Sequence, residues 1–179
     1  MSSTTLRELE RGKRRHLVAF SVGKTAAGLV LVLGLYAVFP ADLLTSVAAF
    51  ALLTVGLLVV AGVLGWQLRS IVRADYPGLR AVTALVLTIT LFVVVFSLAY
   101  LSLSSASPES FSEQLDRISS FYFTVSVLST VGFGDITART DEARVMATLQ
   151  MVLDLTLVAV IGKVIYGSAK ASLKGRKKP

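Results

Sequence analysis

Four long apolar runs dominate the chain and limit the folds that it can adopt. They cover residues 17–39, 43–68, 81–102 and 143–166. A helix needs about 20 apolar residues to cross the hydrocarbon core of a bilayer, and each run is long enough to do so. Hydrophobic residues make up 54% of the 179 residues and charged residues only 16%, which is too apolar for a soluble domain of this size. We therefore predict an all-α membrane protein with four transmembrane helices per subunit.

Basic residues cluster at the ends of the apolar runs and indicate how the helices cross the membrane. The clusters lie in residues 1–16, 69–80 and 168–179, which we expect to be a cytoplasmic N-terminus, linker and tail. Both termini are then cytoplasmic. The net charge is +7, and its basic residues lie at the ends of the apolar runs rather than on one polar face. We therefore expect anionic lipids at the cytoplasmic face as partners and no nucleic acid. We expect a multi-pass protein of the plasma membrane, and the compact design favours a prokaryotic source.

The segment between the last two runs has a different composition. Residues 104–116 are serine-rich and acidic, whereas residues 118–129 are moderately apolar but too short to cross a membrane. Backbone that enters a membrane without crossing it is tolerated only where it is buried in protein or lines a water-filled cavity. We therefore predict a re-entrant helix over 118–129 and an extended return over 130–135 that lines a pore.

The extended return reads Thr-Val-Gly-Phe-Gly-Asp, and here the chain resembles the potassium channel family. The selectivity filter of that family is commonly written TVGYG or TVGFG, followed by Asp. The resemblance covers about half of the chain and implies a pore domain over 81–167, with outer helix 81–102, pore helix 118–129, filter 130–135 and inner helix 143–166. One pore loop cannot enclose an axis by itself, so the resemblance also implies a homotetramer.

The filter residues suit the binding of dehydrated potassium ions. Rings of backbone carbonyls can replace the water around the ion. Gly132 and Gly134 allow backbone angles that other residues avoid, so that successive carbonyls can line one axis. The resemblance implies that four carbonyls bind the permeant K⁺, and that the Thr130 hydroxyl completes the innermost site; the four belong to Thr130, Val131, Gly132 and Phe133. We expect Gly134 mainly to permit this geometry, and we expect no organic cofactor.

Three residues are expected to support the filter: Asp135, Tyr122 and Ser126. Phe133 replaces a tyrosine that is common in the family, so one hydroxyl tie to the pore helix is missing and the filter is expected to be less rigid. Ser126 stands where the family often has a carboxylate. Tyr122 can donate to Asp135 instead, or it can simply pack against the neighbouring helix, and both interpretations stay open.

The outer loop is acidic and is expected to attract cations to the outer mouth, with Arg117 partly offsetting this charge. Its carboxylates belong to Glu109, Glu113, Asp116 and Asp135.

Two polar residues interrupt the last apolar run. Asp154 lies in its middle, where a charge is costly and usually marks an ion pathway or a paired group. Gln150 precedes it by one turn and shares its face. We expect the pair to front the water-filled cavity; the alternative is an Asp154 that is neutral or hydrogen-bonded to the pore helix behind the filter. The family often has a hinge glycine near this position, which leaves Gly162 as the candidate for bending.

The first two runs form a predicted peripheral hairpin over 17–68. Pro40 cannot continue a helix and Asp42 can cap the next one. The interior of the hairpin is rich in small residues that permit close packing: Gly56, Ala61, Gly62 and Gly65. A voltage sensor needs arginines at every third position of a span, but these runs contain only Lys24. We therefore expect a scaffold that does not sense voltage.

Together these features predict the pore-forming subunit of a potassium-selective channel that conducts passively. The alternatives are a non-selective cation channel and a non-conducting regulatory membrane subunit. A filter without its second glycine, or with an acid at Phe133, would favour the first; failure to conduct alone would favour the second. The chain has no cysteine and one histidine, His16, and shows no nucleophile–base pair in its spans, so we do not expect an enzyme.

Overall fold

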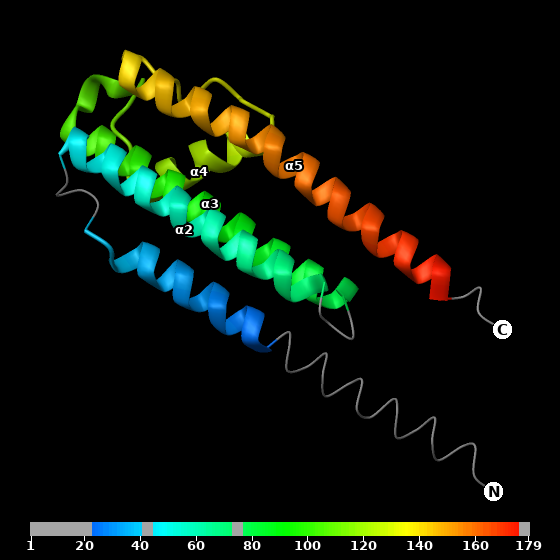
Figure 1. Cartoon of the computed structure of the whole chain (residues 1–179). Helices are drawn as coiled ribbons and strands as arrows, with labels where there is room; N and C mark the ends of the chain where they lie inside the picture. The colour runs from blue at the N-terminus through cyan, green and yellow to red at the C-terminus, as the bar shows by residue number, and fades with distance from the viewer. Residues whose placement is uncertain (1–22, 41–44, 73–76, 176–179) are drawn as a thin grey trace, which may run out of the picture.

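Helices account for most of the residues that the computed structural model describes, which are 23–40, 45–72 and 77–175 (Figure 1). The first helix is Gly23–Val38, and it is followed by α2 (Ser46–Val72), α3 (Pro77–Ala106), α4 (Arg117–Leu128) and α5 (Asp141–Gly175). A single 3-10 turn, Pro108–Ser110, follows α3. Within these described ranges there is no strand, only an isolated bridge between Phe111 and Ala138. The prediction of an all-α protein is confirmed for this part of the chain.

Three of the described helices are long and apolar enough to cross a membrane. The qualifying segments are Ser46–Gln67, Val82–Ala106 and Asp141–Val160, while Gly23–Val38 is apolar but shorter. The predicted first span begins at residue 17, and residues 17–22 lie outside the described residues, as does the predicted cap Asp42. Four spans therefore stay a prediction.

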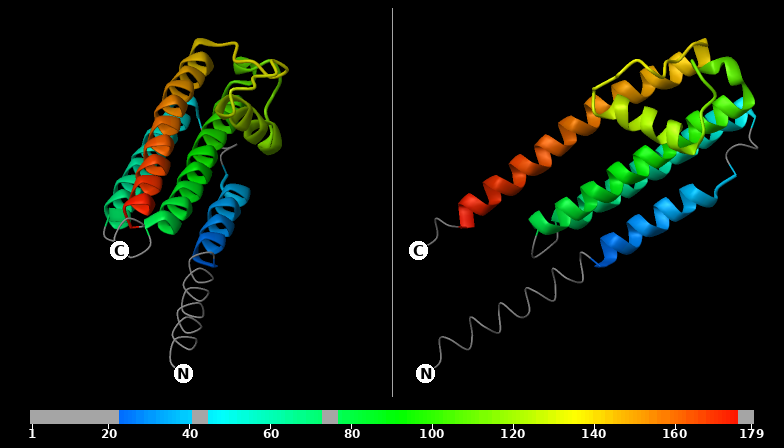
Figure 2. Two further views of the ribbon diagram at one scale, coloured as in Figure 1. Left: turned by 90° about the vertical axis from the view of Figure 1, so that its right-hand side faces the viewer. Right: turned by 180° about the vertical axis from the view of Figure 1, so that it is seen from behind.

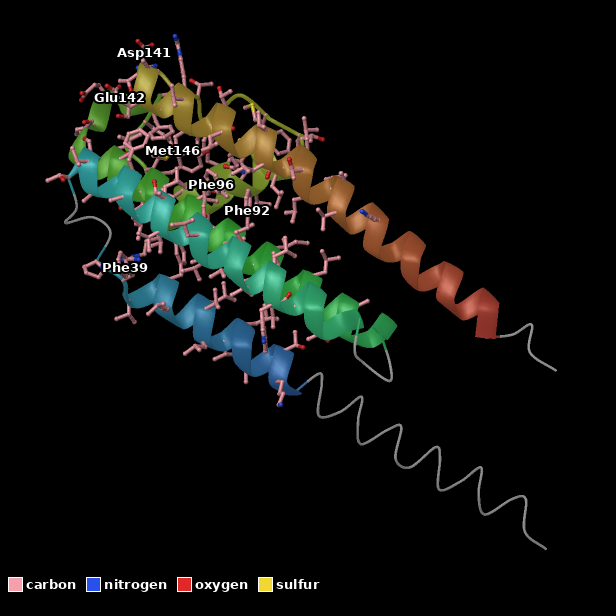
Figure 3. The ribbon with its side chains drawn as sticks, in the orientation of Figure 1. Phe39, Phe92, Phe96, Asp141, Glu142 and Met146 are labelled. Atoms are coloured by element: carbon pink, nitrogen blue, oxygen red, sulfur yellow. The ribbon has the colours of Figure 1, made fainter. Side chains whose placement is uncertain are left out.

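The helices lie side by side, with α4 at one end of the bundle between α3 and α5 (Figures 1 and 2). The first helix packs on α3 from a different side than α4 does: Val32 and Tyr36 contact a small apolar cluster of Val94, Leu98 and Leu101. Phe39 and Asp141 both lie toward the end of the bundle that holds α4 (Figure 3). This arrangement places the predicted peripheral hairpin beside α3 rather than beside α5.

Two predicted boundaries differ from the structure. The linker expected over 69–80 is mostly helical, because α2 continues to Val72 and α3 already begins at Pro77, a residue whose fixed φ suits the first helical position. Residues 73–76 lie outside the described residues. The tail expected from residue 168 is helical as far as Gly175, since Ala and Lys, which favour helix, dominate it and no proline interrupts it. The predicted N-terminus 1–16 and residues 176–179 of the predicted tail lie outside the described residues.

An aromatic column on α3 forms the core beside α4. Phe92, Phe96 and Tyr100 follow one another at helical spacing, and the Tyr100 ring meets Phe111 at 5.7 Å and Phe123 at 5.0 Å between centroids, both edge-on. Figure 3 shows Phe92 and Phe96 of α3 between their helix and α5, and Met146 of α5 belongs to the same buried cluster. This column gives α4 a fixed surface on which to rest.

Close packing of α2 on α3 depends on one glycine. A Cβ at Gly56 would lie 2.5 Å from Val95 Cγ1, so only glycine allows this approach. At Gly62 and Gly65, by contrast, a Cβ would meet nothing within 4 Å. The small residues of the predicted hairpin therefore do not act alike, and the close contact is with α3 rather than between the two hairpin helices.

Candidate ion-conduction site

The short helix α4 begins with a clear cap. The Asp116 carboxylate accepts a hydrogen bond of 2.6 Å from the Ser119 amide, the usual arrangement for an N-cap, and this bond lowers the pKa of Asp116. The helix has 12 residues, too few to cross a bilayer, and it ends where the amide of Ser129 bonds back to the Val125 carbonyl. The predicted helix over 118–129 is thus confirmed to within one residue at each end.

The carbonyl of Ser126 joins the end of α4 to the return that follows. It accepts hydrogen bonds from the amides of Val131, at 3.1 Å, and Gly132, at 3.3 Å, while the Thr130 amide donates to Val127 at 2.9 Å. The sequence interpretation gave Ser126 a supporting role through its side chain. The contacts that the structure provides are made by its backbone, so any small residue there could keep them.

Every second residue of the return has a positive φ. The values are 59° at Thr130, 54° at Gly132 and 79° at Gly134, and Thr130 is the only non-glycine with such an angle in the described part of the chain. Alternating left-handed residues turn alternate peptide units, which an ordinary strand does not do. The predicted need for glycine at positions 132 and 134 is confirmed. All of residues 130–135 are exposed in the single chain.

Tyr122 and Asp135 are joined by a hydrogen bond. The tyrosine hydroxyl donates to Asp135 Oδ2 over 2.7 Å, which lowers the pKa of Asp135 and raises that of Tyr122. The predicted donation is confirmed. The Tyr122 ring also stacks on Phe133, with 6.3 Å between the centroids and 9° between the planes. Phe133 therefore keeps a contact with α4 through its ring although it lacks a hydroxyl.

The chain that follows the return is paired with the segment before α4. The Ser112 hydroxyl donates to the Asp135 carbonyl at 3.2 Å and accepts from the Thr137 amide at 3.0 Å. Further along, the Arg139 amide donates to the Ser110 carbonyl at 2.8 Å. These bonds hold the end of the return against the segment that precedes α4.

The structure corrects the expectation that Gln150 and Asp154 front a water-filled cavity. Gln150 is 0% exposed and Asp154 4% exposed within the single chain. The Tyr100 hydroxyl donates to Gln150 Oε1 at 2.8 Å, and Gln150 Nε2 donates to the Thr124 carbonyl at 3.0 Å and to Asp154 Oδ2 at 3.4 Å. The alternative was a hydrogen bond between Asp154 and α4; in the structure Gln150 makes the bond to α4, and Asp154 bonds to Gln150. Gln150 is buried because its hydrogen-bond partners, Tyr100 and the Thr124 carbonyl, lie on the side of α5 that faces α3 and α4.

Asp154 and Gly162 are the other two residues of α5 that the sequence analysis singled out. Asp154 Oδ1 is buried and has no hydrogen-bond partner among the described residues. At Gly162 a Cβ would meet nothing within 4 Å outside its own helix, and α5 continues through it to Gly175. Bending at Gly162 stays a prediction.

Tyr100 is the structural residue that sequence reasoning missed. It connects the aromatic column to Gln150, and it is fully buried. The sequence did contain a signal: Tyr100 places a hydroxyl within an apolar run, and a hydroxyl inside a membrane must find a hydrogen-bond partner.

These features define the class of pore-loop membrane proteins. In that class a helix too short to cross the membrane is followed by a return, here with alternating left-handed residues, and one long apolar helix lies on each side of the pair in the sequence. Comparison with known families agrees: residues 84–166 match the family model described as Ion channel. This part of the chain is an ion channel domain. No curated protein and no solved structure matches the chain.

Proposed function

We propose that the chain is the pore-forming subunit of a tetrameric, potassium-selective channel that conducts K⁺ passively and is not driven by a voltage sensor. The observation that carries the proposal is the alternation of positive φ angles along the exposed residues 130–134. This alternation supports a row of carbonyls that face one axis, which is what replacement of the hydration shell of K⁺ requires. The carbonyls of residues 130–133 and the Thr130 hydroxyl are the proposed ion ligands.

The exposure of the filter supports assembly with other copies of the chain. Unpaired backbone groups do not face lipid, because an unsatisfied amide or carbonyl there costs several kcal/mol. Residues 130–135 are exposed in one subunit, so protein and ion-filled water must surround them. Four copies around an axis provide both. We propose the same cellular setting as the sequence indicated: a plasma membrane, cytoplasmic termini, anionic lipids at the cytoplasmic face, and no chemical step or organic cofactor.

Ion efflux from liposomes tests the proposal. Purified protein is reconstituted with K⁺ inside and Na⁺ outside, and a proton-coupled dye reports the efflux, which we expect for the wild type. Gly132→Ala places a side chain at φ +54°, a left-handed angle that costs a non-glycine residue about 1 kcal/mol or more, and we expect K⁺ flux to be lost.

Gly62→Ala is the matched control. It adds the same methyl group to a helical glycine where a Cβ meets nothing within 4 Å, so its flux should equal that of the wild type. Equal Na⁺ and K⁺ flux would instead indicate a non-selective channel, and absence of flux in all three proteins would indicate a regulatory subunit. The mass of the purified protein in detergent should correspond to four chains.

A further inference from the structure

The end of the first helix lacks a hydrogen-bond donor. In an α-helix each carbonyl accepts from the amide four residues later, and for Tyr36 that residue is Pro40, which has no N–H. The preceding bond, from the Phe39 amide to Leu35, is still made at 2.9 Å. An unsatisfied carbonyl is costly in a protein that lies in a membrane, so this helix end needs a donor from elsewhere.

Arg117 supplies the missing donors. Its Nη1 donates to the Tyr36 carbonyl at 2.6 Å and its Nη2 to the Phe39 carbonyl at 2.8 Å, two charge-assisted bonds from one planar group. A cation is favourable at a helix C-terminus but unfavourable at an N-terminus. Arg117 is the first residue of α4, where its charge opposes the helix dipole. Its position is therefore explained by the end of the first helix and not by its own helix.

The contact is reciprocal. The Tyr36 hydroxyl donates to the Arg117 carbonyl, and the Tyr36 ring lies 6.1 Å from that of Phe121, one turn further along α4. We call these four residues, Tyr36, Phe39, Arg117 and Phe121, the clasp. It joins segments about eighty positions apart in the sequence, one from the peripheral hairpin and one from the helix that carries the filter.

The clasp is a direct link between the first helix and α4, and Val32 and Tyr36 of the same helix also pack on α3. Four large apolar side chains of that helix are exposed: Val30, Leu31, Leu35 and Val38. The other end of the link leads to the filter, since α4 holds residues 131 and 132 through the Ser126 carbonyl and holds Asp135 through Tyr122. Lateral displacement of the first helix must therefore move the start of α4 or break the clasp.

We propose that the clasp positions the pore helix, so that the first helix regulates the conduction of the filter. This inference rests on the proposed function of the chain as a channel. Arg117 and Tyr36 are positioning residues, which touch no ion and act through α4.

The first experiment measures the clasp without measuring conduction. The chain has no cysteine, so Val38→Cys and Ile118→Cys, both at exposed positions of the two joined helices, give a unique pair of spin labels. Labelled subunits are diluted with unlabelled ones so that only distances within a subunit are recorded. We expect a narrow distance distribution with Arg117 present and a broad one in Arg117→Gln. Equal distributions in the two proteins would overturn the proposal.

The second experiment measures single-channel open probability and K⁺/Na⁺ selectivity. Arg117→Gln should lower the open probability by about tenfold, because it removes two charge-assisted bonds, without changing the selectivity. Arg117→Lys keeps the charge but cannot bridge both carbonyls, so it should recover only part of the activity. Tyr36→Phe should have a smaller effect than Arg117→Gln.

Arg139→Gln is the control for charge, because Arg139 is an exposed basic residue of the same outer region that contributes only its backbone amide. It should leave open probability unchanged. An equal loss in Arg139→Gln, or no loss in Arg117→Gln, would overturn the proposal. A wild type that does not conduct would contradict the proposed channel function instead, and the spin-label distances would still decide whether the clasp holds α4.

Discussion

Replacement of Gln150 by leucine tests the buried hydrogen-bond network between α3, α4 and α5. Gln150 is the only residue that joins α3, α4 and α5 through its side chain in the described part of the structure, by bonds to Tyr100, Thr124 and Asp154. Leucine has a similar volume and can make none of these bonds. The change therefore removes the polar link and leaves the apolar packing nearly intact.

The expected cost follows from the partners that remain. Hydrogen bonds between membrane helices contribute about 0.6 kcal/mol each on average, so the two between helices account for roughly 1 kcal/mol. The Tyr100 hydroxyl is then buried without a partner, which adds about 1–3 kcal/mol. The Thr124 carbonyl is less affected because it belongs to a helix. We expect Gln150→Leu to lower the free energy of unfolding by about 2–4 kcal/mol, or Tm by roughly 4–16 °C for a chain of this size.

The assay is thermal unfolding of the purified protein in detergent, with a double-mutant cycle. Tyr100→Phe removes the orphaned hydroxyl, so Tyr100→Phe combined with Gln150→Leu should cost less than the sum of the single changes. Thr156→Val is the control: it removes a hydroxyl from the exposed side of α5 that bonds only to its own helix, at Val152, and should change Tm little. Additive costs, or a Tm for Gln150→Leu equal to that of Thr156→Val, would refute the reasoning.

Two further predictions concern packing and the outer end of the filter. Gly56→Leu should force α2 away from Val95 and lower the free energy of unfolding by an amount typical of overpacking, about 1–3 kcal/mol, whereas Gly62→Leu should not, and thermal unfolding of both variants distinguishes them. Tyr122→Phe should raise the pKa of Asp135, because the hydrogen bond that lowers it is lost. In the wild type, Asp135 stabilises the fold above its unfolded pKa, and this contribution is lost as pH falls through the lower folded pKa. Carboxyl NMR titration measures the pKa of Asp135 in both proteins. An unchanged pKa in Tyr122→Phe would contradict the claim that the Tyr122 hydrogen bond lowers it.

Segment lengths and the filter motif were enough to predict the elements around the pore. The membrane helices follow from the length of apolar runs, and α4 follows from a run too short to cross. The glycines at 132 and 134 indicated left-handed backbone, and the observed φ angles agree. Such features are local: they depend on residue type and spacing, which the sequence contains directly.

The orientation of the polar residues in α5 could not be predicted in this way. A cavity-facing and a buried Gln150 have the same sequence spacing, and the choice between them depends on how the helix is rotated against its neighbours. That rotation is decided by Tyr100 and by a carbonyl of α4, fifty and twenty-six residues away. Helix ends were also missed where a proline begins an element rather than ending one, as Pro77 does.

Arg117 illustrates the same limit from the opposite direction. In the sequence it is one cation in an acidic loop, and its expected effect is to weaken the attraction of cations to the outer mouth. In the structure its guanidinium is occupied by the Tyr36 and Phe39 carbonyls, so its charge is directed at a helix end rather than at the mouth. Neutralising Arg117 should therefore change gating more than it changes the conductance at low salt. The proline at position 40 contained the necessary signal, because an N–H missing there leaves a carbonyl that some other donor must satisfy.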